Sequence, residues 1–468
     1  MTQPTLNQDD QNFAELLRQI LNHVQGFLGT LEQRPTAINT PPPIPADLSQ
    51  EGEGAEQSLK LFEERYASFM SASAGGRYFA FVTGGVTPAA LMGDWLTSAY
   101  DNNATGTDDS WAGGLEHETL HQLKQLLNLP PELTGSFVSG ATMSNFVGLA
   151  LARQWFGKHY GVNVAQEGLQ KLPHALKILS ATPHSSIYKA LAMLGIGRDN
   201  LERIPTLPDR EAIDLKALEK KLAELKIPAI VVANAGTVNT VDYDDLEGLK
   251  QLKERYPFWL HVDAAFGAFA ACSPKYAHYL QGIEAADSIC IDAHKYLNVP
   301  YDAAMQFTKH LNLQGEVFAN SAVYLAQQLS ETSFIHLTPE NSRRLRALPA
   351  WFSLQAYGKQ GYQQLVEQSC ALASEMARQL EASGKFQLLA PMRLNGLCFG
   401  FRDDEGPFET SFARIQRYLK ALQAEGSVFL SPTSYKGKAA IRASVSNWRT
   451  QSSDINRAVQ AMLALADE

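Results

Sequence analysis

The fold of this chain is decided by two short stretches, FWLHVDAAF at residues 258–266 and SICIDAHKYL at residues 288–297. Each begins with an apolar, β-rich run that is typical of a strand buried on both faces, and each ends in polar residues. Two further runs have the same character, ALKILSA (175–181) and AIVVANA (229–235), and amphipathic helical patterns lie between the runs at KALEKKLAEL (216–225) and DDLEGLKQLKERY (244–256). This alternation predicts an α/β sheet, largely parallel and covered by helices on both faces.

The α/β pattern extends over residues 76–345, which we expect to form one large domain of the 468-residue chain. After SRRLRALPAW (342–351) the pattern changes to two long helical stretches on either side of LCFGFRD (397–403), followed by SVFLSPTSY, AAIRASVSNW and a last helix from Ser453. This order predicts a small C-terminal α+β domain over residues 346–468.

Residues 1–75 are expected to form an N-terminal helical arm. Apolar residues recur at spacings of three and four from Phe13 to Leu31, which is one face of an amphipathic helix. The polar face is not enriched in Lys or Arg, so a membrane-surface role is disfavoured, and we expect the apolar face to pack on the body of the chain or on a second subunit. The prolines of TPPPIPADL (40–48) exclude a helix and predict an extended connector.

The composition excludes several classes of partner. The chain has 40 Lys+Arg against 49 Asp+Glu, a net charge of -9, so it lacks the basic footprint of a nucleic-acid-binding protein. It has no apolar run long enough for a membrane span, and its polar, acidic N-terminus is unlike a secretory signal, so we expect a cytoplasmic protein. The four cysteines have none of the paired spacings of a zinc site, and we expect no metal and four reduced core residues: Cys272, Cys290, Cys370 and Cys398.

Reactive residues follow the ends of the predicted strands, where ligands bind in open α/β sheets. His184, Thr237, Asp263 and Lys295 each stand at or just after one of the four runs. Singly, each has an ordinary structural explanation, but their joint placement points to a site. A fifth element, FVSGATMSNFVGLALAR (137–153), passes through small residues into a helix whose first turn can bind a phosphate: Gly140, Ala141 and Thr142.

A lysine, a carboxylate, a histidine and an anion-binding turn are the groups needed to hold pyridoxal phosphate (PLP). At HVDAAFGAFA, DSICIDAHKYLNVPYDAA, TPHSSIYKA, NAGTVNTVDYDDL and SRRLRALPAW the sequence resembles the group II PLP-dependent decarboxylases, which act on aromatic amino acids, glutamate and diaminobutyrate. The resemblance runs from about residue 60 to the C-terminus. It implies the fold of the aspartate aminotransferases, fold type I.

The resemblance also implies roles for individual residues. Lys295 would form the Schiff base with the cofactor aldehyde, and Asp263 would pair with the protonated pyridine nitrogen. His184 would stack on one face of the ring, and Ala265 would lie beneath the other. Thr237 would lie near the ring. The residues that would line the phosphate are Gly140, Ala141, Thr142, Asp292 and His294. Asp292 stands where animal aromatic decarboxylases have Asn, and a carboxylate beside a phosphate needs a bridging donor or a different orientation.

We therefore expect a PLP-dependent decarboxylase that converts an L-amino acid to its amine and CO2. The family segment that contributes to the side-chain pocket matches residues 77–96, which offer Phe79, Phe81, Val82 and Thr83 and no obvious cation beyond Arg77. This composition favours an aromatic or other apolar substrate. The resemblance further implies a homodimer with its active site at the interface and the N-terminal arm wrapped around the partner.

Three alternatives remain open from the sequence: a decarboxylation-dependent aldehyde synthase, an aminotransferase or retro-aldol lyase of the same fold, and a non-enzymatic PLP-binding scaffold. In aromatic decarboxylases a mobile loop before the paired arginines supplies a proton-donating tyrosine, and counting back from Arg343 places Phe334 there. Phe cannot donate a proton, but His336 on the same segment can. We therefore expect Phe334 at the substrate pocket, His336 as the proton donor and amine as the main product.

Overall fold

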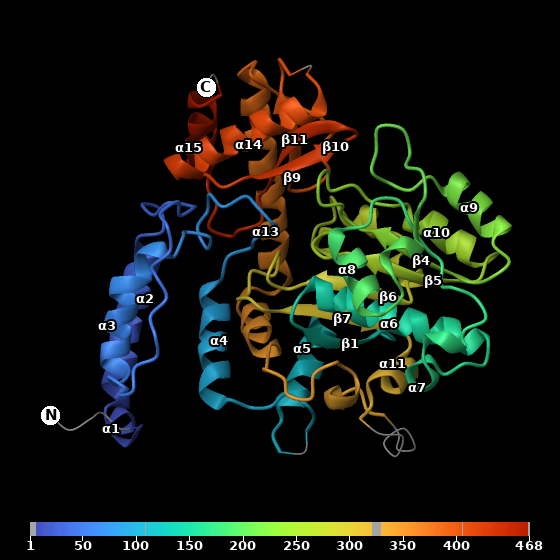
Figure 1. Ribbon diagram of the computed structural model, residues 1–468, viewed down its shortest axis with the longest axis horizontal. Coiled ribbons are helices and arrows are strands. Elements are labelled where there is room, and N and C mark those ends of the chain that lie inside the picture. Colours follow the sequence, from blue (N-terminus) through green and yellow to red (C-terminus); the bar gives the residue numbers. More distant parts are fainter. Residues whose placement is uncertain (1–5, 108, 321–328, 405, 467–468) are drawn as a thin grey trace.

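The computed structural model describes residues 6–107, 109–320, 329–404 and 406–466. Its larger sheet has seven strands in the order β1-β7-β6-β5-β4-β2-β3 (Figure 1). The strands are β1 (Thr134–Val138), β2 (Ile178–Ser180), β3 (Leu201–Arg203), β4 (Ala229–Asn234), β5 (Phe258–Asp263), β6 (Ser288–Asp292) and β7 (Ala304–Thr308). Among these described strands, β7 alone runs against the common direction and is antiparallel to both β1 and β6. The predicted, largely parallel sheet is therefore confirmed.

Helices cover the large sheet and bury its central strands completely. Every residue of β4, β5 and β6 is buried, which explains why these strands read as continuous apolar runs. The helices of this part are α4 (Pro88–Tyr100), α5 (Ala112–Leu126), α6 (Ala141–His159), α7 (Val164–Glu167), α8 (Ser185–Met193), α9 (Leu215–Glu224), α10 (Leu246–Lys253) and α11 (Leu311–Phe318). Among them α6 packs directly on β5, β6 and β7 and is largely buried.

A second, antiparallel sheet forms the small C-terminal domain, in the order β10-β11-β9-β8. Its elements are β8 (Phe386–Leu388), β9 (Gly396–Phe401), β10 (Ser431–Tyr435), β11 (Lys438–Ser444), α14 (Phe408–Glu425) and α15 (Ser452–Ala464). The long helix α13 (Ala347–Ala382) packs on α4 and α5 at one end and on α15 and β8 at the other, and so joins the two parts. The predicted fold class is therefore confirmed.

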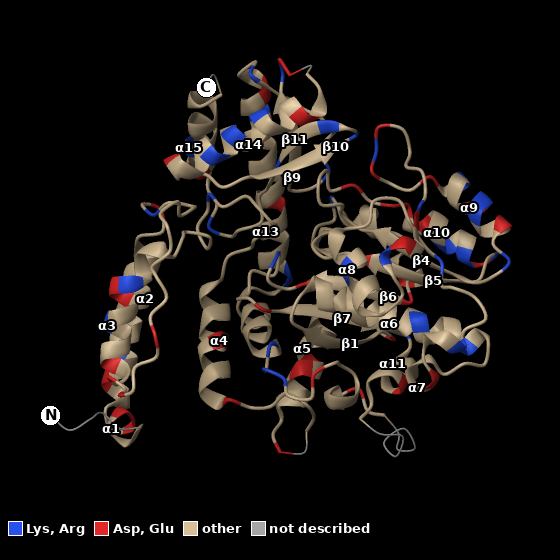
Figure 2. Cartoon of the chain, viewed as in Figure 1, with Lys and Arg blue, Asp and Glu red and all other residues tan. Residues whose placement is uncertain are grey.

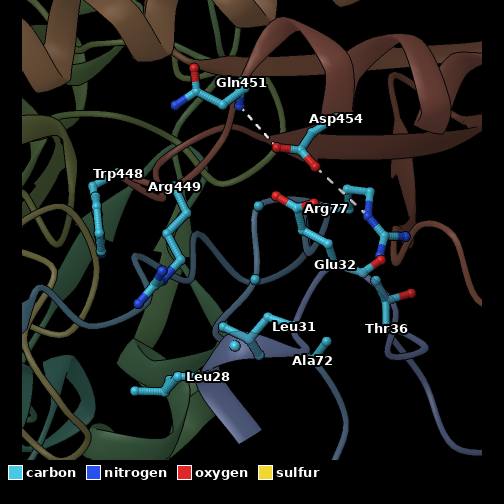
Figure 3. A pocket seen from close by; sticks show the side chains of 13 residues that line it. Leu28, Leu31, Glu32, Thr36, Ala72, Arg77, Trp448, Arg449, Gln451 and Asp454 are labelled. Carbon is cyan, nitrogen blue, oxygen red and sulfur yellow. Dashed lines mark hydrogen bonds and ion pairs between the residues drawn. The ribbon is translucent and has the colours of Figure 1, made fainter. Parts of the chain in front are cut away.

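The N-terminal arm consists of α1 (Leu6–Gln11), α2 (Phe13–Gly29) and α3 (Ala55–Arg65), at the blue edge of the molecule in Figure 1. Figure 3 shows the junction where the end of α2 meets the small domain around Arg77. The Arg77 guanidinium is only 3% exposed; it donates to the carbonyl of Glu32 at 2.7 Å and lies 3.8 Å from Asp454. Arg77 therefore fastens the arm to α15 and is not a cation of a substrate pocket.

The distribution of charges and the burial of the cysteines agree with the predictions made from the sequence. Figure 2 shows Lys and Arg close to Asp and Glu on α2 and α9, so neither helix presents a face of one sign. None of the helices in the described part of the chain is long and apolar enough to cross a membrane. The four cysteines are free and buried, as predicted.

One fully buried ion pair connects the segment that enters α13 to α5 and the large sheet. Arg343 and Glu116 of α5 have side chains with 0% exposure, and Nη2 of Arg343 lies 2.9 Å from Oε1 of Glu116. The same carboxylate oxygen accepts the backbone N–H of Phe137 at 2.8 Å, and Arg343 donates to the Phe137 carbonyl at 2.6 Å. The pair thus connects α5, β1 and the chain that enters α13.

We predict that Glu116→Ala strongly destabilises the protein, because it leaves the Arg343 guanidinium buried without its carboxylate. The expected loss is about 3–5 kcal/mol in the free energy of unfolding. Urea denaturation followed by circular dichroism measures this loss, with Gln125→Ala, an exposed residue of the same helix, as the control. A Glu116→Ala variant as stable as the control would contradict the importance of the pair.

Candidate active site

The carboxyl ends of β2, β4, β5 and β6 lie side by side and open into one cavity of about 820 Å³. The residues that were singled out after separate strands line this cavity together: Ala141, His184, Thr237, Asp263, Ala265, His294 and Lys295. The sheet order places their strands next to each other, which is why residues more than a hundred positions apart in the sequence meet here.

Lys295 lies between two carboxylates. Its Nζ is 3.1 Å from Oδ2 of Asp292, and Asp263 is close enough to act on its charge. Burial opposes the positive charge, but the attraction of the two carboxylates outweighs it and raises the pKa of Lys295 above its ordinary value. The lysine therefore carries a proton at neutral pH in the cofactor-free chain.

Asp263 ends β5 and is 7% exposed. Its Oδ1 accepts the backbone N–H of Ala265 at 3.2 Å, and its Oδ2 accepts Nδ2 of Asn145 at 3.1 Å. The carboxylate is thus held by one donor on each oxygen and keeps a fixed direction in the cavity wall.

Both histidines of the cavity are held neutral by burial. His184 caps α8, and its Nδ1 lies 2.8 Å from Oγ of Ser186. Burial lowers the pKa of His184 and of His294, although nearby carboxylates act in the opposite direction. The ring of His294 packs against Tyr301, with ring centroids 4.2 Å apart. A neutral imidazole presents a flat face that can pack on another aromatic ring.

The first turn of α6 lies beside Asp292 and His294. Gly140 is its N-cap, and the N–H of Ala141 donates to Oδ1 of Asp292 at 3.1 Å. A Cβ added at Gly140 would lie 3.6 Å from Cε1 of His294, so the turn and the histidine are close neighbours. Thr142 belongs to the same first turn. A helix N-terminus of this kind favours an anion such as a phosphate.

The segment expected to form the side-chain pocket is tightly folded against the Lys295 loop. Phe81 and Val82 both have φ of +58°, and a β-branched residue is rarely found there. A Cβ at Gly84 would lie 1.7 Å from the Lys295 carbonyl oxygen, so only glycine allows this approach. Phe81 and Val82 line the cavity, and Oγ1 of Thr83 lies 3.2 Å from the Tyr301 hydroxyl.

Three of the residues that were assigned to the site lie elsewhere. Phe79 is 1% exposed and packs in the core of the small domain, because the chain turns between it and Phe81, where the N–H of Thr83 donates to the Ala80 carbonyl at 3.2 Å. Phe334 is fully buried beneath the Arg343 guanidinium, 4.9 Å from the ring centroid, so it does not reach the cavity of its own chain. His336 ends the same short 3-10 helix and is absent from the described lining of the cavity.

Further residues line the cavity that the sequence analysis did not identify: Glu211, Tyr301 and Arg442. Oε2 of Glu211 accepts the hydroxyls of Thr237 at 2.5 Å and Thr240 at 2.7 Å. Arg442 comes from β11 of the small domain. A single arginine within the apolar run AAIRASV was the one available signal for it.

Comparison with known proteins identifies the family of the chain. Residues 39–402 match the family model described as the pyridoxal-dependent decarboxylase conserved domain. The chain belongs to this family of decarboxylases. The aromatic-L-amino-acid decarboxylase of Bacillus atrophaeus is 29% identical to this chain over 405 residues. The matched region covers 84% of this chain and 81% of that relative. The chain is accordingly a PLP-dependent carboxy-lyase that acts on an amino acid.

Solved structures confirm the fold of the decarboxylase. Oryza sativa TDC with PLP and tryptamine has a TM-score of 0.89 at 22% identity, over 100% of this chain and 99% of that one. Rhodiola rosea 4-hydroxyphenylacetaldehyde synthase has a TM-score of 0.86 at 20% identity, over 98% of each chain. One fold therefore carries both of these proteins and the present decarboxylase.

The cavity of the decarboxylase fits PLP. It offers an amine for the aldehyde, a fixed carboxylate for the pyridine nitrogen and a helix N-terminus for the phosphate. In the cofactor-free chain the Asp292 carboxylate has two donors of its own, the N–H of Ala141 and Nζ of Lys295.

We predict that Asp292→Asn speeds the attachment of PLP to the cofactor-free decarboxylase at neutral pH. An amine must lose its proton before it attacks an aldehyde, and removing the Asp292 carboxylate lowers the pKa of Lys295. The rate of attachment should therefore rise with pH in both proteins, and the profile of the variant should lie at lower pH. Stopped-flow absorbance of the bound cofactor measures this.

Asp302→Asn is the matched control, because this half-exposed carboxylate pairs with Arg346 and not with Lys295. If Asp292→Asn attaches PLP more slowly than wild type at every pH, Asp292 acts by positioning Lys295 rather than by holding its proton.

Proposed function

We propose that this decarboxylase acts on an L-amino acid with an aromatic or apolar side chain and releases the corresponding amine. The observation that carries the proposal is the lining of the cavity beside Lys295. Phe81 and Tyr301 are 56% and 60% exposed in the single chain, and with Val82 they offer apolar surface to a side chain. Exposed rings at the mouth of a reactive cavity suit a flat, apolar ligand.

The proposal assigns a role to each residue around the cofactor. PLP, when bound, supplies a positively charged ring that accepts the electron pair released as the substrate carboxylate leaves as CO2. Lys295 would hold the aldehyde carbon, and Asp263 would keep the pyridine nitrogen charged. His184 and Ala265 would confine the two faces of the ring, with Thr237 at its edge. The phosphate would lie at Gly140, Ala141 and Thr142, with His294 and Asp292 beside them.

The cations near the cavity are engaged with groups of the protein. Arg77, the cation of the pocket segment, is engaged at the junction with the arm. Of the cations that line the cavity, Arg210 pairs with Asp242, Arg203 donates to the Tyr188 hydroxyl, Lys436 donates to the Thr206 hydroxyl, and Glu211 lies near Arg442. An acidic side chain would have to displace one of these contacts to gain a cation.

The substrate is tested by incubating the holoenzyme with a panel of amino acids and measuring CO2, amine, aldehyde and oxygen uptake. We expect CO2 and amine in equal amounts from phenylalanine, tyrosine or tryptophan, and turnover of glutamate and 2,4-diaminobutyrate lower by orders of magnitude. Lys295→Ala should be inactive, because the cofactor can no longer be attached or transferred efficiently. The exposed Lys189→Ala on α8 is the control.

Two results would contradict this proposal. Preferred turnover of glutamate or diaminobutyrate would refute the assignment of an apolar pocket. Aldehyde with oxygen uptake in place of amine would identify an aldehyde synthase. His336 remains our proposed proton donor, and because it lies outside the cavity of its own chain it would have to act in the site of a second copy.

We also propose that the decarboxylase is a homodimer that pairs through the arm. No residue of α2 is buried in the single chain, although its stripe is strongly apolar. Phe13, Leu17, Ile20 and Leu21 are 56%, 51%, 38% and 41% exposed. An apolar face of this extent on a soluble chain marks an interaction surface. A second copy of the chain, with a stripe of its own, is the partner that suits it.

We predict that Leu17→Asp combined with Leu21→Asp converts the dimer to a monomer, because two carboxylates would then lie within the apolar interface. Analytical ultracentrifugation measures the mass, and Asn22→Asp, on the opposite side of α2, should remain dimeric. A monomeric wild type, or a double variant that stays dimeric, would exclude pairing through this face.

A further inference from the structure

We propose that Asn145, on α6, is a positioning residue that holds Asp263 and His184 in a fixed mutual arrangement through its single carboxamide. The inference deepens the proposed function, because it rests on the roles given there to Asp263 and His184. Asn145 itself is fully buried and is not among the residues that line the cavity.

The NH2 group of the Asn145 carboxamide donates to two acceptors. Its Nδ2 donates to Oδ2 of Asp263 at 3.1 Å and to Oγ of Ser186 at 3.1 Å. Ser186 Oγ in turn lies 2.8 Å from Nδ1 of His184. One NH2 group thus contacts the carboxylate directly and the histidine through a hydroxyl, although Asn145 and Asp263 are 118 positions apart in the sequence.

The orientation of the carboxamide is fixed from behind by His261. Oδ1 of Asn145 lies 2.8 Å from Nε2 of His261, and Nδ1 of that ring lies 2.7 Å from Oγ of Ser288. Ser288 accepts Nε1–H of Trp259 at 2.9 Å. Because an indole nitrogen can only donate, Ser288 Oγ accepts from Trp259 and its own proton is available for Nδ1; since Oδ1 of Asn145 is an acceptor, the tautomer that satisfies both contacts of His261 has its proton on Nε2.

The Asp263 carboxylate fixes the direction of this carboxamide. If the carboxamide were rotated by half a turn, its oxygen would face the carboxylate, and two acceptors would then oppose each other inside the protein. The His261 ring would also have to move its proton to Nδ1 to accept the rotated NH2. Burial lowers the pKa of His261 to about 4, so the ring stays neutral and keeps a single proton across the range in which an enzyme works.

The sequence makes room for this arrangement. Gly148 follows Asn145 by one turn of α6, and a Cβ there would lie 2.6 Å from Cε1 of His261. The glycine lets the imidazole lie against the helix beneath Asn145. His261 is 1% exposed, and the motif HVDAA thereby supplies both Asp263 and the residue that orients its donor.

The test measures the affinity of the cofactor-free protein for PLP across pH 5–9, by titration of absorbance, for wild type, Asn145→Leu and Asn145→Asp. Asn145→Leu keeps the volume and removes the donor, so the affinity should fall about tenfold at pH 7. This loss should not recover towards acid pH, because leucine supplies no donor at any pH.

Asn145→Asp gives the opposite dependence. At pH 8 its carboxylate opposes that of Asp263, so the affinity should fall further than in Asn145→Leu. Towards acid pH the two carboxyl groups share a proton, which restores a donor, and the affinity of this variant should recover while that of wild type declines. A role in packing alone would not produce this reversal.

Two further variants complete the design. Ser144→Ala removes a buried hydroxyl from the preceding position of α6 that bonds to the Met305 carbonyl instead, and it should leave the affinity unchanged. Asp263→Asn separates the two hypotheses. If Asp263→Asn keeps full affinity, the role proposed for Asp263 is wrong; if it loses affinity and both Asn145 variants follow the wild-type profile, the present inference is overturned. Equal losses in Ser144→Ala and Asn145→Leu without the reversal in Asn145→Asp would overturn it as well.

Discussion

The site depends on the parallel pairing of β4, β5 and β6, because this pairing brings the ends of separate strands to one edge. Asn234 pairs with Asp263, and Asp263 pairs with Cys290, so β4, β5 and β6 end at nearly the same level. Helices bury both faces of these strands, so their middle positions are apolar with the exception of His261, and the other polar residues lie at the strand ends. The reactive residues consequently occupy the strand ends, and the same constraint explains why they could be found from the sequence.

Burial then requires that each charge at this edge has a partner. Lys295 lies beside Asp292 and near Asp263, Glu211 accepts the hydroxyls of Thr237 and Thr240, and desolvation lowers the pKa of His184 and of the fully buried His261. The ion pair of Arg343 and Glu116 differs from this arrangement. That pair satisfies itself within the protein interior, whereas Lys295 and Asp263 line an open cavity.

The features that were predicted from the sequence are those that depend on short-range patterns of apolar and polar residues. The strands, the helix at residues 215–224, the small domain and the ends occupied by His184, Asp263 and Lys295 follow from periodicity and from the rule for strand ends. Contacts between distant segments could not be read in this way. Phe79 stands beside Phe81 in a pocket-like sequence but points into the small-domain core, and Arg77 binds carbonyls of the arm. Glu211, Arg442 and Asn145 were missed because each gains its meaning only from a partner far along the chain.

The two domains meet at the cavity, so its shape is not a property of the large sheet alone. Thr433 of β10 donates to Oδ1 of Asn239 at 2.6 Å, and Nδ2 of Asn239 donates to Glu211 at 3.0 Å. On the other side, Ser446 donates to the Thr83 carbonyl at 3.1 Å, next to Gly84, which lies against the Lys295 carbonyl. Small-domain residues thus bond to both walls, the one that holds Thr237 and the one that holds the lysine loop. The position of the small domain therefore helps to fix both walls, and the strained backbone at Phe81 and Val82 belongs to the second wall.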